Sequence, residues 1–304
     1  MTITADHFPT SPLALRTATP DTQTSVRAFA DRMAEAANAA RDQLTTLWAS
    51  ASTQEQRASA LHTVHESLIQ WRYQTAVRTG RRLGTGIGYN PDRFVTPITD
   101  QTINYDRLGY NGRLRDGAYW DETTRTYRGG QNTPAHQTMI RYGAAAEKRF
   151  EREAPEADVL SNWIALADGR RIAGNRILRG AAAATVADEL AARVAARGLD
   201  ATRMETGGHP IYTATPAEQD SRILFTEALK LLSNPACTTG EFLTARYLMF
   251  QSPRTKKGSD AVNRVFTVTV GSLLLGDDAP TLPADIDLRC YVLGQTAATQ
   301  PLDA

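Results

Sequence analysis

The chain has 304 residues, of which 41% are hydrophobic, and its 34 Lys and Arg nearly balance its 33 Asp and Glu, leaving a formal net charge of +1. It is long enough for one large core or two modest ones, and it lacks the excess positive charge of a general nucleic-acid binder. Its two cysteines exclude a disulfide framework, and no Cys/His spacing predicts a metal site. Because no apolar stretch approaches the roughly 18 residues of a membrane span and no secretory signal opens the sequence, we expect a cytoplasmic protein without a membrane partner.

The first half is predicted to be largely helical. Residues 1–22 contain Thr, Pro and Ala but few large apolar side chains, so we expect a flexible terminus or one draped over the rest. Apolar residues then recur with helical spacing over residues 21–50 and 53–80, among many alanines. The helical signal returns at residues 134–153, and residues 23–154 are predicted to form one N-terminal helical region.

Between residues 84 and 134 the sequence is rich in Gly, Asn, Asp, Tyr and Arg, which predicts a long irregular segment. Loops of this length are uncommon in compact domains unless they bind something or cover a site. Tyr and Arg side chains can stack on rings and meet charged groups. Two interpretations stay open: an insertion packed by its own aromatic residues, or a lid that recognises a ligand.

The second half is predicted to hold further helices and one small hairpin. Thr215, Pro216 and Glu218 combine an N-cap hydroxyl, a proline at the first helical position and a glutamate at the third, so a helix should begin there. Just before it, two glycines interrupt a short β-prone run, which predicts a hairpin over residues 205–213. The helices are expected at residues 157–167, 181–197, 216–232, 239–250 and 260–275. The last of these contains many β-formers, but its length favours a helix over a strand.

The segment 250–264 carries the strongest functional signal, because cations and a Gly-Ser-Asp step separate two apolar stretches. Ser259 or Asp260 is a good N-cap for the helix that follows, and the first N–H groups of a helix have no intrahelical partners. Together with the positive end of the helix dipole, these donors suit a phosphate. The predicted anion site therefore contains Arg254, Lys256, Lys257, Gly258 and Ser259. The alternative is a solvated basic turn that binds nothing.

Three stretches, taken in order, resemble the Fic superfamily, whose enzymes move part of a nucleotide, usually AMP, onto a hydroxyl of a target. Residues 171–177 resemble the Ile-Glu-Gly-Asn signature of that family, and residues 207–212 resemble its β-hairpin flap, which holds a target segment by strand addition. Residues 245–264 and the apolar helix after them resemble its core helix–loop–helix. The resemblance implies a mostly α protein in which residues 155–304 form a Fic-like helical domain with a small β-hairpin flap.

The sequence also departs from the family pattern. The loop of the family begins with His-Pro-Phe, continues with an acidic residue that holds Mg²⁺ and closes with Gly-Asn-Gly-Arg, whereas Ser252, Pro253 and Arg254 open this loop and Lys256 lies near the acidic position. The general base and the metal ligand are missing, which argues against ordinary AMP transfer and against Mg²⁺. A lysine there could neutralise a diphosphate directly. Ala173 replaces the glutamate that can restrain these enzymes, so such self-inhibition is not expected.

Four residues are assigned roles partly through this resemblance. His209, on the expected flap, could replace the missing base, or it could be an exposed turn histidine. Asp260 and Asn263 could ligate a metal or orient a ribose, although Asp260 is also interpreted as a helix cap. Arg264 could reach a phosphate as the closing arginine of the family does. His209 and Asp260 are the catalytic candidates, and Asn263 and Arg264 join the phosphate- or nucleotide-binding set. Asp285 and Asp287 are interpreted as part of a charged turn.

The function expected from the resemblance is a Fic-like transferase that binds a nucleotide or another phosphate-bearing ligand and uses non-standard chemistry on a protein or small-molecule acceptor. Two alternatives stay open: a catalytically silent Fic-fold scaffold, and a biosynthetic enzyme that acts on a small molecule beneath residues 84–134. A homo-oligomer is compatible with each of them. No metal-binding residue is assigned, and a nucleotide is the only cofactor considered.

Overall fold

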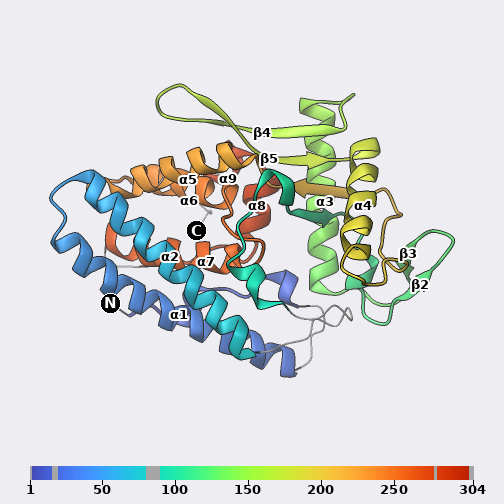
Figure 1. Ribbon diagram of the computed structural model, residues 1–304, viewed down its shortest axis with the longest axis horizontal. Helices are drawn as coiled ribbons and strands as arrows, with labels where there is room; N and C mark the ends of the chain where they lie inside the picture. The colour runs from blue at the N-terminus through green and yellow to red at the C-terminus, as the bar shows by residue number, and fades with distance from the viewer. Residues whose placement is uncertain (1, 16–19, 80–89, 277–278, 301–304) are drawn as a thin grey trace.

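The computed structural model describes residues 2–15, 20–79, 90–276 and 279–300, and within these ranges the chain is mostly helical, as predicted (Figure 1). Two long helices and three shorter ones pack into one layer around a shared apolar core. They are α1 (Pro20–Ala49), α2 (Gln54–Thr79), α5 (Glu218–Ser233), α6 (Thr239–Gln251) and α7 (Ser259–Leu274). Among the described residues, no helix has the length and apolar character to cross a membrane.

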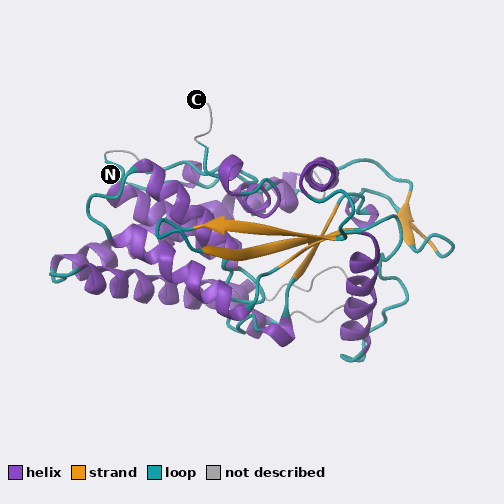
Figure 2. Cartoon of the chain, turned by 90° about the horizontal axis from the view of Figure 1, so that it is seen from above, coloured by secondary structure: helices purple, strands orange, loops and turns teal. Residues whose placement is uncertain are grey.

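A four-stranded antiparallel sheet lies beside this helical layer, with strand order β1-β6-β5-β4. Alternate residues of its strands face two small cores: Ile211 packs with α3 and α8, while Tyr212 packs with α4. Figure 2 shows the strands with helices on either side. The elements are β1 (Tyr105–Leu108), β4 (Val159–Ala165), β5 (Arg171–Leu178), β6 (Ile211–Ala214), α3 (Pro134–Glu153), α4 (Gly180–Ala195), α8 (Ile286–Val292) and α9 (Gln295–Ala298).

Local sequence signals explain how α6 and α7 begin. Thr238 and Glu241 form the capping box of α6, each side chain hydrogen-bonding to the backbone N–H of the other. Gly258 precedes α7 in the left-handed region at φ +83°, where a Cβ would lie 2.6 Å from the Phe94 ring. The preference for helix over strand in residues 260–275 is confirmed. Eleven successive residues, from Ala261 to Gly271, are buried in this helix, which is why its sequence shows no polar face.

Two local predictions are wrong. Residues 157–167 are not helical: β4 alternates buried and exposed side chains, with Leu160 and Ile164 inside and Trp163 54% exposed, as a strand on a sheet does. The hairpin expected at residues 205–213 is also absent from the described chain, because β6 lies between β1 and β5 rather than folding back on its own neighbour. Tertiary pairing decides both cases.

The segment 84–134 is less irregular than predicted where the structure describes it, from residue 90 onward. It supplies β1 to the main sheet and forms a separate hairpin of two short strands. Its elements are η3 (Pro91–Phe94), η4 (Asp100–Thr102), η5 (Gly112–Leu114), β2 (Tyr119–Asp121) and β3 (Thr126–Arg128). The first residues of the segment, 84–89, lie outside the described residues.

The predicted division of the chain into regions needs two corrections. A boundary between residues 154 and 155 would cut through one core and one sheet, since α1 packs on α7 and β1 pairs with β6. Of the two expectations for residues 1–22, a flexible terminus is wrong and a terminus draped over the rest is what the described part shows. Ile3 and Phe8 are almost fully buried, Asn38 exchanges hydrogen bonds with the Ile3 backbone at 2.7 and 3.1 Å, and η1 (Ala5–His7) and η2 (Pro12–Ala14) are ordered turns.

Candidate functional site

A cavity of about 360 Å³ lies where the loop before α7 meets the sheet and α8, and we call it the α7 cavity. Three segments form most of its wall: the loop itself, strands β1 and β6 with Asn175 of β5, and one face of α8. Its lining residues are Leu13, Arg93, Asn104, Tyr105, Asp106, Met139, Asn175, Thr213, Ala214, Thr215, Pro253, Thr255, Lys256, Lys257, Gly258, Ser259, Asp260, Asp287, Leu288 and Tyr291.

The first turn of α7 offers hydrogen-bond donors at this cavity. Ser259 Oγ accepts from Thr255 N at 3.1 Å and donates to Thr255 O at 3.0 Å, which closes the loop on itself. Within the described residues, the backbone N–H groups of Ser259, Asp260 and Ala261 have no hydrogen-bond partner, and the first N–H of the helix to find one is that of Val262, which donates to Gly258 O. These free donors lie at the positive end of the α7 dipole.

Lys256 adds positive charge to the same wall. Its half-buried ammonium donates to the carbonyls of Thr102 and Ile103. Burial and then the nearby positive charges of Arg193, Arg93 and Arg197 together lower its pKa to about 8, although Asp106 partly opposes them. Several cations therefore repel one another around Lys256. An anion in the cavity would relieve this repulsion and favour the protonated lysine.

Asp106 faces the cavity from β1. Its side chain is exposed at the cavity, and the protein packed around it raises the pKa of the carboxyl above the ordinary value. The positive charges of Arg113 and Lys256 oppose the rise without cancelling it. In the described chain, the Asp106 carboxylate makes no hydrogen bond and no ion pair. It is therefore an available proton acceptor.

Asp260 and Asp287 also line the cavity, but both are engaged by Arg264. The buried guanidinium donates to Asp260 at 2.8 Å and to Asp287 at 3.2 Å, and it also donates to the carbonyls of Pro283 and Ala284, each at 3.1 Å. Burial raises the pKa of Asp287 to about 7, and the Asp260 charge adds to the rise. Arg264 thus holds the start of α7 against the turn before α8.

A buried amide network fixes the floor of the cavity. Asn175 donates through its side chain to Tyr291 O at 3.0 Å, and its backbone N–H donates to Gln251 Oε1 at 2.8 Å. Gln251 in turn donates to Cys290 O at 2.6 Å, so one network joins β5, the end of α6 and α8. A side chain at Gly174 would collide with Gln251 Oε1. This close approach explains the glycine in the Ile-Ala-Gly-Asn stretch.

Tyr291 projects from α8 at the edge of the cavity. Burial and then the negative charges of Asp287, Asp106 and Asp260 raise its pKa well above the ordinary value, so the phenol stays protonated. Its hydroxyl contacts no hydrogen-bond acceptor in the part of the chain that the structure describes. The α7 cavity therefore has a cationic wall at the loop and an acidic wall that includes Asp106, with a phenol donor beside it.

The structure brings five of the nine predicted site residues into this cavity: Lys256, Lys257, Gly258, Ser259 and Asp260. The other four lie elsewhere. Arg254 turns toward α5, where its guanidinium lies 4.9 Å from the centre of the Phe225 ring. Asn263 is buried and donates to Met249 O at 2.9 Å. Arg264 lies behind Asp260, with its donors occupied. His209 does not line the α7 cavity.

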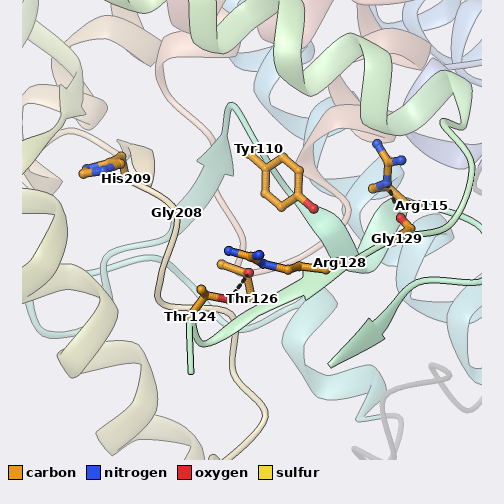
Figure 3. Close-up of a pocket in the computed structure, with 8 residues that line it drawn as sticks. All are labelled: Tyr110, Arg115, Thr124, Thr126, Arg128, Gly129, Gly208 and His209. Atoms are coloured by element: carbon orange, nitrogen blue, oxygen red, sulfur yellow. Dashed lines mark hydrogen bonds between the residues drawn. The ribbon is translucent and has the colours of Figure 1, made fainter. Parts of the chain in front are cut away.

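His209 borders a different cavity, of about 730 Å³, beside the β2–β3 hairpin (Figure 3). Two arginines and a tyrosine dominate this second cavity, but their polar groups are already engaged. Arg115 donates to Gly129 O at 2.6 Å, Arg128 pairs with Asp121 at 2.9 Å, and Tyr110 donates to Tyr127 O at 2.6 Å. Arg115 and Tyr110 therefore hold the backbone of the hairpin region with their donors, and Arg128 is paired with Asp121.

Sequence reasoning missed Asp106, Tyr291 and Arg93. Asp106 reaches the site because β1 pairs with β6, which lies more than 100 residues later in the chain. No local sequence pattern indicates that pairing. The one available signal was a charged residue within the β-prone run Tyr105–Leu108.

No group of three or more possible metal ligands occurs among the described residues. Neither a protein-family model nor a curated protein matches this sequence.

Proposed function

We propose that the protein is a transferase that binds a nucleotide or nucleotide sugar in the α7 cavity, with a phosphate at the first turn of α7. The observation that carries this proposal is the pair of partnerless N–H groups at Ser259 and Asp260, two residues that line the cavity together with Lys256. A cavity of about 360 Å³ lies within the size range of small-molecule sites, roughly 300 to 1,000 Å³.

The charge distribution orients such a ligand. A phosphate is attracted by the loop wall and repelled by the carboxylate of Asp106 on β1, so the anionic end of the ligand should lie at α7. The carboxylates of Asp260 and Asp287 oppose this less, because Arg264 pairs with both. The neutral or reacting end then faces the acidic wall. This arrangement separates a site for the leaving phosphate from a site for the acceptor.

The proposed relationship to the Fic superfamily has uneven support. The order of α6, a loop and the buried α7 agrees with the expected helix–loop–helix. The expected flap does not, since β6 has strands on both sides and cannot receive a target strand at either edge. Ser252, at the position of the family base, is buried and donates to Leu248 O at 2.7 Å. Transfer would therefore need a base from another element.

Ser259→Asp tests the proposal without dismantling the loop. Aspartate is favoured in the first turn of a helix, and its carboxylate can accept the hydrogen bond that Ser259 Oγ accepts from Thr255 N. Its negative charge lies beside the N–H groups that would hold the phosphate, so we expect ligand binding to be lost. Stability should fall by only about 1 kcal/mol, because the carboxylate cannot make the hydrogen bond that Ser259 Oγ donates to Thr255 O. Ser259→Asn has the same shape without the charge and should retain most of the binding.

Calorimetric titration and thermal unfolding with ATP, UDP-glucose and pyrophosphate, each with and without Mg²⁺, measure this difference. A ligand at about 100 times its Kd should add about 2.7 kcal/mol to the stability of the native protein. Comparing ATP with UDP-glucose distinguishes the two donor classes. The proposal is overturned if none of the three ligands stabilises the native protein, or if Ser259→Asp binds as tightly as Ser259→Asn.

A further inference from the structure

We propose that Asp106 is the general base of the transfer reaction and takes the proton from the attacking hydroxyl of the acceptor. This inference rests on the proposed function and deepens it. It assigns the catalytic role to β1, a strand remote in sequence from the loop that would bind the phosphate.

The backbone around Asp106 holds its carboxylate in a fixed position. Asp106 pairs with Thr213 of β6, and the residues on either side of it are anchored on the opposite face of the sheet. Tyr105 donates to Glu189 of α4 at 3.0 Å, and Arg107 donates to Tyr110 O at 2.9 Å and Gly207 O at 2.7 Å. Because alternate side chains of a strand point to opposite faces, these anchors leave Asp106 directed at the cavity.

Asp106 differs from the other two carboxylates that line the cavity. Asp260 and Asp287 both accept from Arg264, so their lone pairs are partly engaged and a proton taken there would weaken an ion pair. Asp106 makes no such contact with any described residue. It can therefore accept a proton without breaking an interaction that holds the fold together.

The environment of Asp106 suits a general base. Partial removal from water raises its pKa and makes the carboxylate a better proton acceptor, while Lys256 and Arg113 favour the ionised form. The alternatives in the cavity are weaker. Tyr291 holds its proton too tightly to act as a base, and can donate a hydrogen bond instead. The Ser252 hydroxyl is buried and bonded to Leu248 O.

In the proposed transfer step, one bond forms at the donor, one bond breaks there, and one proton moves to Asp106. The acceptor oxygen forms a bond to the electrophilic centre of the donor, which is phosphorus in a nucleotide or the anomeric carbon in a nucleotide sugar, and Asp106 receives the hydroxyl proton. The bond from that centre to the leaving phosphate oxygen breaks, and the oxygen keeps the electron pair. The negative charge that develops there faces the N–H groups of α7 and Lys256.

Asp106→Asn is the direct test, because it keeps the shape of the side chain and removes its basicity. Donor turnover is followed by ³¹P NMR with ATP and with UDP-glucose, water standing in for the acceptor hydroxyl, and donor affinity is measured by calorimetry on the same protein. We expect turnover to fall about 10²- to 10⁴-fold while donor affinity changes less than about threefold. Asp188→Asn, which removes an exposed carboxylate on α4, should leave both unchanged.

The pH profile separates a base from a positioning residue. Native turnover should rise with pH through the raised pKa of Asp106 and then level off, and the variant should lose that rising limb. Unchanged turnover in Asp106→Asn overturns the inference, as does a loss of affinity equal to the loss of turnover. A native protein that binds a donor but never releases product also overturns it. If the native protein binds no donor, the result contradicts the proposed function itself rather than the role of Asp106.

Discussion

His65 on α2 is a titratable residue buried in the helical core. It is 1% exposed, lies between the rings of Phe225 and Phe266 at centroid distances of 4.9 and 5.2 Å, and its Nδ1 has no hydrogen-bond partner. Its Nε2 lies 3.4 Å from Asn263 Oδ1. Burial lowers its pKa to about 3, and the positive charges of Arg254 and His62 act in the same direction.

This histidine makes the protein sensitive to acid. A folded-state pKa below the ordinary 6.5 means that the unfolded chain binds the proton first, so the free energy of unfolding should fall as pH drops from about 6.5 toward 3. One such group contributes a slope of up to about 1.4 kcal/mol per pH unit. His65→Met should flatten this dependence in urea unfolding between pH 6 and pH 4.

His62→Met is the matched control, since His62 lies three residues away on the same helix with an exposed side chain. It should keep the native pH dependence. If His65→Met and the native protein lose stability equally on acidification, other groups dominate and the buried histidine is not the cause.

At the scale of single elements, the turn into α7 depends on Gly258. Its φ of +83° is unfavourable for any residue with a Cβ, and that atom would lie 2.6 Å from Phe94 Cδ1 and 2.8 Å from Arg72 Cγ. Gly258→Ala should therefore lower the free energy of unfolding by about 1 to 3 kcal/mol, measured in urea. We also expect weaker ligand binding, because the shift displaces the first N–H groups of α7.

Gly240→Ala is the matched control, a second glycine-to-alanine substitution for which we expect no loss of stability. Gly240 lies in the first turn of α6, with no positive φ and no heavy atom within 4 Å of the added methyl group. Alanine is the better helix former, so stability should stay the same or rise by up to about 1 kcal/mol. Equal losses at both glycines would mean that the left-handed turn before α7 is not the sensitive feature.

The elements that the sequence predicted correctly are those whose signals are local. Helical spacing placed α3, α5, α6 and α7 within two residues of their observed ends, and it placed Lys256 to Asp260 at the start of α7. The predicted caps were wrong: Ala217 rather than Thr215 precedes α5, and Gly258 rather than Ser259 or Asp260 precedes α7. β4 failed because its apolar residues also fit helical spacing, and its pairing with β5 settles the outcome. Asp106 was missed because only the tertiary pairing of β1 with β6 brings it to the cavity.

At the scale of the whole molecule, the main core contains residues from both sides of the predicted boundary at residue 154. It runs from Ile3 at one end of the chain to Ala298 at the other, and it includes residues of all five helices of the helical layer. The sheet likewise combines β1 from the first half with three strands from the second. Neither half can bury its apolar surface alone, so the chain should unfold as one cooperative unit.

Leu44→Ala tests this cooperativity, because Leu44 of α1 is fully buried in the shared core and far in sequence from the sheet. Truncating a buried leucine costs about 2 to 5 kcal/mol. In one cooperative unit, that loss should accelerate the slowest hydrogen exchange of β5 amides as much as that of α1 and α2 amides, measured by mass spectrometry under native conditions. Glu35→Ala, on the exposed side of α1, should change neither. Faster exchange confined to α1 and α2 would instead mean that the two halves open separately, with the α7 cavity able to form without the first two helices.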